Sequence, residues 1–110
     1  MTTKTRRVEN MRGGKGHVLF EDILDAAAFR DKGRLYSRIT LEPGCSIGYH
    51  EHHGESETFY ILKGEGQYND NGVIRSVRAG DVTFTPDASG HSMENTGTEN
   101  LEFMALILYW

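Results

Sequence analysis

The stretch GYHEHHGESETFYILKGEG, residues 48–66, contains three of the chain's five histidines within four positions. If residues 46–53 form a β-strand, alternate side chains point to opposite faces, so that His50 and His52 share one face and His53 lies on the other. We therefore expect His53 to face solvent or to lie behind the inward pair. A one-residue bulge would exchange the places of His52 and His53, and that alternative stays open.

A carboxylate follows the histidines on the same predicted face. A turn at HGES brings the next strand back beside the first, and its first residue, Glu57, then lies next to the histidine pair. Phe59 and Ile61 share that face, and Val82 and Phe84 of a later strand are expected to add an apolar floor. Two imidazoles and one carboxylate in an apolar pocket are a ligand set that suits a first-row divalent metal ion.

His91 is the candidate for a fourth ligand. It follows TPDASG and begins a predicted strand on which Met93 and Asn95 lie in phase with it. His17 stands outside the strand region, and we expect it to be exposed. The usual zinc patterns are missing from the sequence, since it has no H-E-x-x-H motif and its single cysteine, Cys45, cannot form a structural zinc knuckle.

The composition bounds the class of protein. A chain of 110 residues with 37% apolar residues suits one compact domain. The longest apolar run, FMALILYW, has 8 residues and ends the chain, which favours a final strand over a membrane span. The first 16 residues lack the apolar region of a signal peptide, and one cysteine cannot form an internal disulfide. We therefore expect a cytoplasmic protein without a membrane partner.

Charge is distributed unevenly along the chain. Residues 1–16 carry five basic side chains and one acidic side chain, net +4, whereas residues 17–110 carry seven basic and fifteen acidic ones, net −8. We interpret residues 1–16 as a flexible basic arm and residues 17–110 as a single barrel domain. The arm could touch nucleic acid or anionic lipid, but a solvated segment is the favoured interpretation. The acidic body argues against nucleic acid as a partner.

The pattern after Gly33 is typical of short strands separated by turns. One short helix is predicted before it, over residues 20–30, from apolar residues at helical spacing. Strands are expected at residues 34–42, 46–53, 57–63, 66–70, 73–77, 81–85, 91–95 and 101–109. The pattern predicts an all-β fold, a small antiparallel jelly roll or β-barrel with one short N-terminal helix.

Two motifs resemble those of the cupin superfamily. The first has the form G-x5-H-x-H-x4-E-x6-G and runs from Gly44 to Gly64, and the second has the form G-x5-P-x4-H-x3-N and runs from Gly80 to Asn95. The short spacer between them resembles that of small single-domain microbial cupins. The family usually has glycine where this chain has Ala88, which is a turn position and not a ligand position.

The resemblance implies a metal site. Cupin barrels hold their metal with two histidines and a glutamate of the first motif and a histidine of the second. In this chain those residues are His50, His52, Glu57 and His91. The implied cofactor is one divalent transition metal, with Mn, Fe, Co, Ni and Zn all open.

Further residues are candidates for the wall of a substrate pocket. Phe59 and Met93 lie next to predicted ligands and could contact a substrate. Tyr36 and Arg38 share one face of the first strand after Gly33. If that face is inward, Arg38 could clamp a carboxylate; if it is outward, Arg38 is a surface or interface charge, which is the interpretation we favour slightly.

Several functions are compatible with this pocket. No second carboxylate lies in phase with the predicted ligands, so the acid–base mechanism of the superfamily's oxalate decarboxylases is poorly supported. Metal-centred, dioxygenase-like chemistry on a small organic molecule needs fewer protein groups and is the leading enzymatic hypothesis. The alternatives are a non-catalytic cupin that binds or senses a small molecule, and a module stabilised by its metal. We also expect a homodimer, since superfamily members commonly pair.

Overall fold

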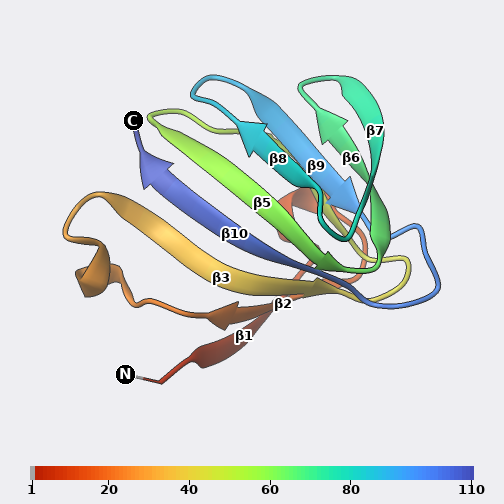
Figure 1. Ribbon diagram of the computed structural model, residues 1–110, viewed down its shortest axis with the longest axis horizontal. Helices are drawn as coiled ribbons and strands as arrows, with labels where there is room; N and C mark the ends of the chain where they lie inside the picture. The colour runs from red at the N-terminus through yellow and green to blue at the C-terminus, as the bar shows by residue number, and fades with distance from the viewer. Residues whose placement is uncertain (1) are drawn as a thin grey trace.

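Residues 2–110, which the computed structural model describes, form two antiparallel sheets (Figure 1). The larger sheet has the order β1-β2-β3-β10-β5-β8, and the smaller has the order β4-β9-β6-β7. The strands are β1 (Lys4–Glu9), β2 (His17–Asp22), β3 (Gly33–Leu41), β4 (Ser46–Glu51), β5 (Glu55–Lys63), β6 (Glu65–Asp70), β7 (Val73–Arg78), β8 (Val82–Thr85), β9 (Gly90–Glu94) and β10 (Leu101–Tyr109). Two short 3-10 helices, η1 (Met11–Gly13) and η2 (Ala26–Phe29), complete the chain.

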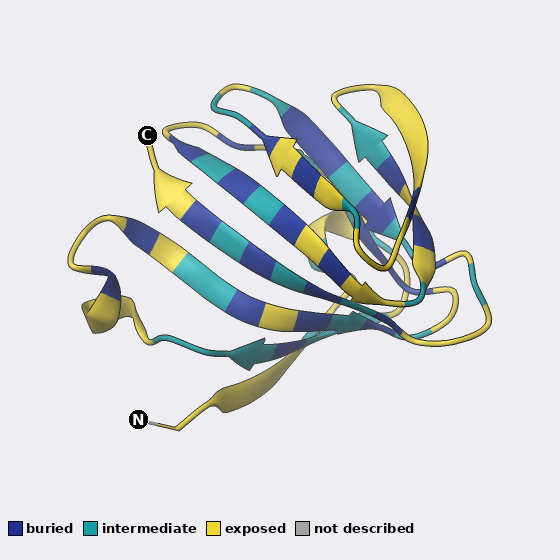
Figure 2. Cartoon of the chain, in the orientation of Figure 1, coloured by how far each residue is buried: buried dark blue, intermediate teal, exposed yellow. Residues whose placement is uncertain are grey.

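The core lies between the two sheets. The long strands β3, β10 and β5 alternate buried and less buried side chains, which Figure 2 shows as bands of different colour. Ile39, Phe59 and Phe103 of the larger sheet pack in one buried cluster with Tyr68 and Met93 of the smaller sheet. Burial of one face of each sheet is the main favourable contribution to the stability of such a fold.

The predicted strands are present in the structure, but the predicted helix over residues 20–30 is wrong. Residues His17–Asp22 form β2, in which Val18 and Phe20 are buried and their neighbours are less so, a period of two. The helical content nearby is one turn, η2, whose start is capped by Asp25 through the Ala28 amide. Over so short a segment the apolar residues fit both the helical period of 3.6 and the strand period of two. Pairing with β3 makes the segment a strand.

The first sixteen residues contain a strand that the sequence analysis did not predict. β1 pairs along its whole length with β2, from Lys4 opposite Asp22 to Glu9 opposite His17. Its side chains are largely exposed, and it has no second neighbour in the sheet order. Alternation of apolar and polar residues is the signal for a strand, and a strand with little buried surface lacks it.

The apolar floor expected from Val82 and Phe84 is also wrong. Both side chains are on the outer surface, 59% and 53% exposed. β8 pairs with β5 so that Thr83 lies opposite Phe59 and Thr85 opposite Glu57, and these two threonines are the buried residues of β8. The register therefore puts the polar members of this strand on the inner face.

The turn formed by residues 10–14 is docked on β4. A Cβ at Gly14 would lie 2.2 Å from the carbonyl oxygen of Ser46, and a Cβ at Gly48 would lie 2.0 Å from that of Arg12. The two backbones approach so closely that only glycine fits at both positions. This contact holds the N-terminal segment against β4 of the smaller sheet.

Within the described part of the chain, no helix is long and apolar enough to cross a membrane.

Candidate metal centre

Four side chains converge between the two sheets. His50 comes from β4, His52 follows it, Glu57 lies on β5 and His91 on β9, and one ligand atom of each lies within 4.8 Å of all the others. β4 and β9 pair directly with His50 opposite His91, and a bulge precedes this pair. The bulge does not exchange the neighbouring histidines: His52 is buried, whereas the His53 side chain is 70% exposed.

The spacing of these atoms fits a metal ion. Nε2 of His52 lies 3.0 Å from Nε2 of His91, and Oε1 of Glu57 lies 3.0 Å from the first nitrogen and 2.9 Å from the second. Ligand atoms held ~2.1 Å from a metal on adjacent corners of an octahedron are ~3.0 Å apart. The three atoms thus have the separation of one octahedral face, and the chemistry of the donor set suits a first-row divalent ion.

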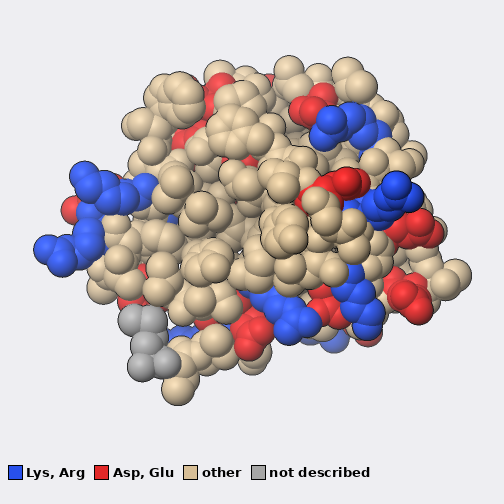
Figure 3. All heavy atoms as spheres, in the orientation of Figure 1, with Lys and Arg blue, Asp and Glu red and all other residues tan. Residues whose placement is uncertain are grey.

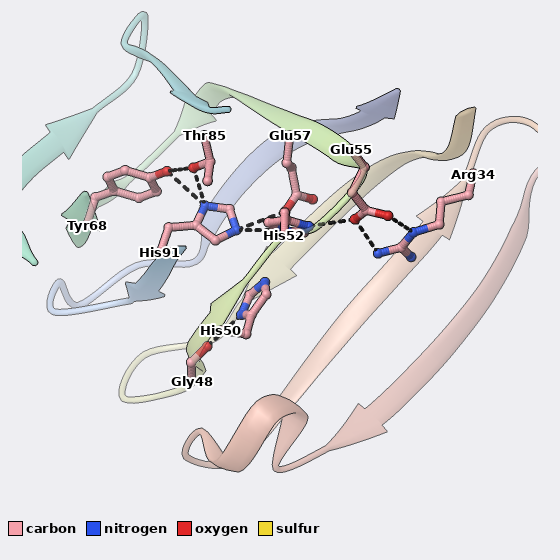
Figure 4. A network of polar contacts seen from close by, with 9 residues as sticks. All are labelled: Arg34, Gly48, His50, His52, Glu55, Glu57, Tyr68, Thr85 and His91. Atoms are coloured by element: carbon pink, nitrogen blue, oxygen red, sulfur yellow. Dashed lines mark hydrogen bonds and ion pairs between the residues drawn. The ribbon is translucent and has the colours of Figure 1, made fainter. Parts of the chain in front are cut away.

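Hydrogen bonds orient two of the imidazoles for this role. Nδ1 of His50 donates to the carbonyl oxygen of Gly48 at 2.8 Å, and Nδ1 of His52 donates to Oε2 of Glu55 at 2.6 Å (Figure 4). Both acceptors fix the proton on Nδ1, which leaves Nε2 of each ring with a lone pair for a metal.

The third imidazole is held by hydroxyl groups. Nδ1 of His91 lies 2.8 Å from the hydroxyl of Tyr68 and 2.9 Å from that of Thr85, and these hydroxyls are 2.6 Å apart. The Phe59 ring stacks on His91 with centroids 5.0 Å apart. Nε2 of His91 therefore also faces the cluster. Neither Tyr68 nor Thr85 was predicted. Alternation could have found Tyr68, which lies on the buried face of β6, but it pointed the wrong way for Thr85, because the apolar residues of β8 face outward.

Glu55 was missed for a different reason. The sequence analysis began this strand at Glu57 and placed Glu55 in the turn, but β5 begins two residues earlier. Glu55 is thus in phase with Glu57, which overturns the expectation that no second carboxylate shares the ligand face. Its carboxylate is not free, because Arg34 donates to both of its oxygens, at 2.8 and 2.7 Å, and His52 donates to one of them.

The titration behaviour of the cluster favours metal binding. Burial lowers the pKa of His50 to about 4, so this imidazole is neutral near pH 7. Burial would raise the pKa of Glu57, but hydrogen bonds from His52 and His91 outweigh it and hold the pKa at about 2. The same contact with Glu57 raises the pKa of His52. The cluster therefore offers an ionised carboxylate that attracts positive charge, whether a proton or a metal ion.

A pocket of about 120 Å³ opens from the cluster. Its walls are mostly apolar, but three arginines line it as well, Arg6, Arg12 and Arg34. Two of these belong to the segment expected to be a solvated arm. A larger hollow of about 620 Å³ lies beside β1 and β2 and contains none of the four clustered residues.

The structure separates the four predicted substrate contacts into two pairs. Phe59 lines the pocket, and Met93 is buried in the core. Arg38 and Tyr36 lie on the opposite face of β3 from the buried Ser37 and Ile39, so the structure does not bring them to the pocket. Arg38 forms an ion pair with Glu102 on that outer face. Of the two alternatives for Arg38, a clamp for a carboxylate or a surface charge, this position corresponds to the surface charge.

Comparison with known proteins agrees with the fold. A family model described as "Cupin domain" matches residues 37–107. The oxalate-binding protein of Thermotoga maritima is 50% identical over 102 residues, which cover 93% of this chain and 84% of that protein. An oxalate decarboxylase of Bacillus subtilis is 32% identical over 100 residues, covering 86% of this chain but 25% of its own length.

Solved structures show the same architecture. The crystal structure of a predicted oxalate decarboxylase from Thermotoga maritima superposes with a TM-score of 0.95 at 47% identity, covering 98% of this chain and 94% of that one. The likeness includes the N-terminal residues that the family model leaves out. The chain belongs to the cupin family.

Proposed function

We propose that this protein binds a small dicarboxylate, of the size and charge of oxalate, at a divalent metal held by His50, His52, Glu57 and His91. The observation that carries the proposal is the 120 Å³ pocket, in which three of the four clustered residues, His50, His52 and Glu57, line the same space as arginine side chains. Oxygen donors of a dicarboxylate suit a divalent metal, and guanidinium groups suit carboxylates.

The volume supports a very small ligand. The pocket of about 120 Å³ is smaller than the ~300–1,000 Å³ of most ligand pockets. A two-carbon dicarboxylate is among the ligands small enough for such a space. Two relatives, an oxalate-binding protein and an oxalate decarboxylase, are named for a ligand of the same class.

Binding without turnover is the first choice because the pocket lacks a free acid–base group. Of the two carboxylates near the cluster, Glu57 belongs to the ligand set and Glu55 is held by Arg34 and His52. Neither is available to move a proton to or from a ligand. Decarboxylation with a protein carboxylate as acid is therefore poorly supported.

Metal-centred, dioxygenase-like turnover is the second candidate. It is favoured by the apolar side chains of Phe20, Ile39 and Phe59, which line part of the pocket beside the cluster. For a metal that prefers six ligands, four protein ligands leave two positions, and a dicarboxylate bound through both carboxylates fills both. A ligand bound through one carboxylate leaves a position for dioxygen.

Calorimetry on metal-free and metal-loaded protein tests the first proposal. The protein is stripped with a chelator, reloaded with Mn²⁺, Fe²⁺, Co²⁺, Ni²⁺ or Zn²⁺, and titrated with oxalate. We expect one oxalate per loaded chain, no binding to the stripped protein and much weaker binding of acetate. Failure of every loaded form to bind oxalate would refute the proposal. Oxygen consumption in the presence of oxalate or another small carboxylate would favour turnover instead.

We also propose that the protein is a cytoplasmic homodimer that pairs through the outer face of the larger sheet. Tyr60, Leu62, Val82 and Phe84 are 41–59% exposed on strands β5 and β8. Figure 3 shows a broad area without charged side chains across the centre of this view. An apolar face of this kind is self-complementary across a two-fold axis. Light scattering is expected to give twice 12.4 kDa, and Phe84→Glu to give the monomer.

A further inference from the structure

The three arginines that line the metal pocket differ in their partners. Arg6 donates to Asp22 at 2.7 and 3.2 Å and lies over the Phe20 ring, and Arg34 donates twice to Glu55. Within residues 2–110, no carboxylate forms an ion pair or hydrogen bond with Arg12. Of the pocket's cations, Arg12 is therefore the one whose charge is not balanced by a carboxylate.

The backbone holds Arg12 in an unusual conformation at the mouth of the pocket. Its φ is 55° and its ψ is 30°, a left-handed geometry that costs a non-glycine residue on the order of 1 kcal/mol. The close contact of Gly14 and Gly48 with the facing backbones keeps this turn seated on β4. The carbonyl oxygen of Gly48 also accepts the hydrogen bond from His50, so the same residue contacts the turn and orients a ligand of the cluster.

The charges around the pocket add up to a simple balance. With Arg34 paired to Glu55 and Arg6 paired to Asp22, the charged groups that remain are Glu57 and Arg12. Together with a divalent metal and neutral histidines, they give the pocket a net charge of +2. Without Arg12 the same sum is +1. Arg12 is exposed where it lines the pocket, so solvent screens part of its charge, but a dianion still gains more from this extra positive charge than a monoanion does.

We propose that Arg12 is a specificity-determining residue that makes the pocket select small dianions, such as two-carbon dicarboxylates, over monoanions of the same shape. The guanidinium would donate to the carboxylate oxygens that point away from the metal, toward the pocket mouth. The proposal rests on the proposed function, because it needs a dicarboxylate bound at the cluster. It goes beyond it by naming the residue and the charge that set the preference.

The test compares oxalate with oxamate, which has the same shape and one negative charge less, on metal-loaded protein. In the unmodified protein oxalate is expected to bind tighter than oxamate. Arg12→Gln is expected to weaken oxalate binding ~10- to 100-fold, the usual range for one hydrogen bond to a charged group, and to change oxamate binding by less than ~3-fold. Arg12→Lys, which keeps the charge, should lose only part of the preference.

Arg7→Gln is the matched control, since Arg7 is an arginine of the same segment that pairs with Glu9 and does not line the pocket. Metal content is measured for every variant, so that a loss of metal is not read as a loss of ligand affinity. The oxalate affinity of the unmodified protein should also fall more steeply with added salt than that of Arg12→Gln.

The outcomes separate the two proposals. If the loaded, unmodified protein binds neither oxalate nor oxamate, the proposed function fails. If it binds oxalate and Arg12→Gln binds it equally well, or loses oxalate and oxamate to the same degree, the assignment of Arg12 fails while the proposed function stands. If Arg12→Gln proves unstable, Arg12→Gly decides, because it also removes the charge and suits the φ of 55°: an unchanged ratio of oxalate to oxamate affinity overturns the assignment.

Discussion

Nδ1 of His52 lies 2.6 Å from Oε2 of Glu55, so that a carboxylate fixes the ring whose other nitrogen faces the metal cluster. Arg34 holds the same carboxylate from β3 through two hydrogen bonds. The chain Arg34–Glu55–His52 thus ties the position of one ligand to the neighbouring strands of the larger sheet. Such supporting carboxylates set both the orientation and the basicity of a ligating imidazole.

Removal of this support should weaken the metal site. Glu55→Ala is expected to lower metal affinity ~10- to 100-fold, because His52 loses its fixed tautomer and orientation. Competition with a chromophoric chelator measures the affinity. Glu51→Ala is the control, a change of an exposed carboxylate on the same stretch that contacts His53. Equal affinities of Glu55→Ala and the unmodified protein would show that Glu55 has no such role.

The two adjacent histidines should differ sharply. His52→Ala is expected to abolish stoichiometric metal binding, since its Nε2 is one corner of the triangle with Glu57 and His91. His53→Ala should leave one metal per chain, because that side chain is exposed. Metal analysis of both purified variants after reloading measures the difference. The reverse result would mean that the ligand is His53.

Acid should destabilise the metal-free protein through His50. Its pKa is about 4 when folded and 6.5 in the unfolded chain, so between these values the unfolded state binds more protons. Stability therefore rises with pH across this window and is lost as the pH falls from 6.5 to 4. Urea midpoints measured across that range should change less for His50→Gln than for the unmodified protein. His53→Gln, a change of an exposed ring, should follow the unmodified protein.

Ala88 occupies a strained turn position. Its φ is 65°, and its amide donates to the carbonyl oxygen of His52 at 2.7 Å. Ala88→Gly is expected to stabilise the protein by ~0.5–1 kcal/mol, because glycine adopts this conformation without the Cβ contact. A thermal melt should show Tm higher by about 2–6 °C. Ala79→Gly, at an exposed turn residue without positive φ, should instead lower Tm.

The contact between the N-terminal turn and β4 can be tested without a change of Arg12. Gly14→Ala would place a Cβ 2.2 Å from the carbonyl oxygen of Ser46, so the turn must move away from β4. We expect metal binding to persist and oxalate affinity to fall, as calorimetry would detect. Gly13→Ala is the comparison: its φ of +78° strains any side chain, unlike that of Gly14, but a Cβ there meets no atom within 4 Å. A greater loss of oxalate affinity for Gly13→Ala would contradict this account.

The sequence predicted the ligand cluster because alternation in a strand is a strict rule. His50, His52 and Glu57 could be placed on one face without knowledge of the partner strands, and the second motif supplied His91. The same rule would have found Glu55 had the turn been taken as two residues shorter. Turn lengths depend on local hydrogen bonds that the residue pattern does not specify.

Other parts of the site were out of reach of pattern alone. β1 buries little surface, so its residues carry no alternating signal, and its basic composition resembles that of a solvated segment. The position of Arg12 follows from the contact of Gly14 with β4, which is a meeting of segments distant in sequence. A glycine in the sequence does not show which distant segment its backbone will approach.

β1 pairs with β2 alone, contributes only the partly buried Val8 to the core, and carries Arg6, a wall residue of the pocket. Segments with one partner and little buried surface open at a low free-energy cost, far below that of global unfolding. Exchange of a bound molecule with solvent can therefore proceed by brief detachment of this strand while the paired centre of the larger sheet stays closed. The residence time of a ligand would then depend on how often β1 detaches, whereas its affinity would depend on its contacts with the metal cluster.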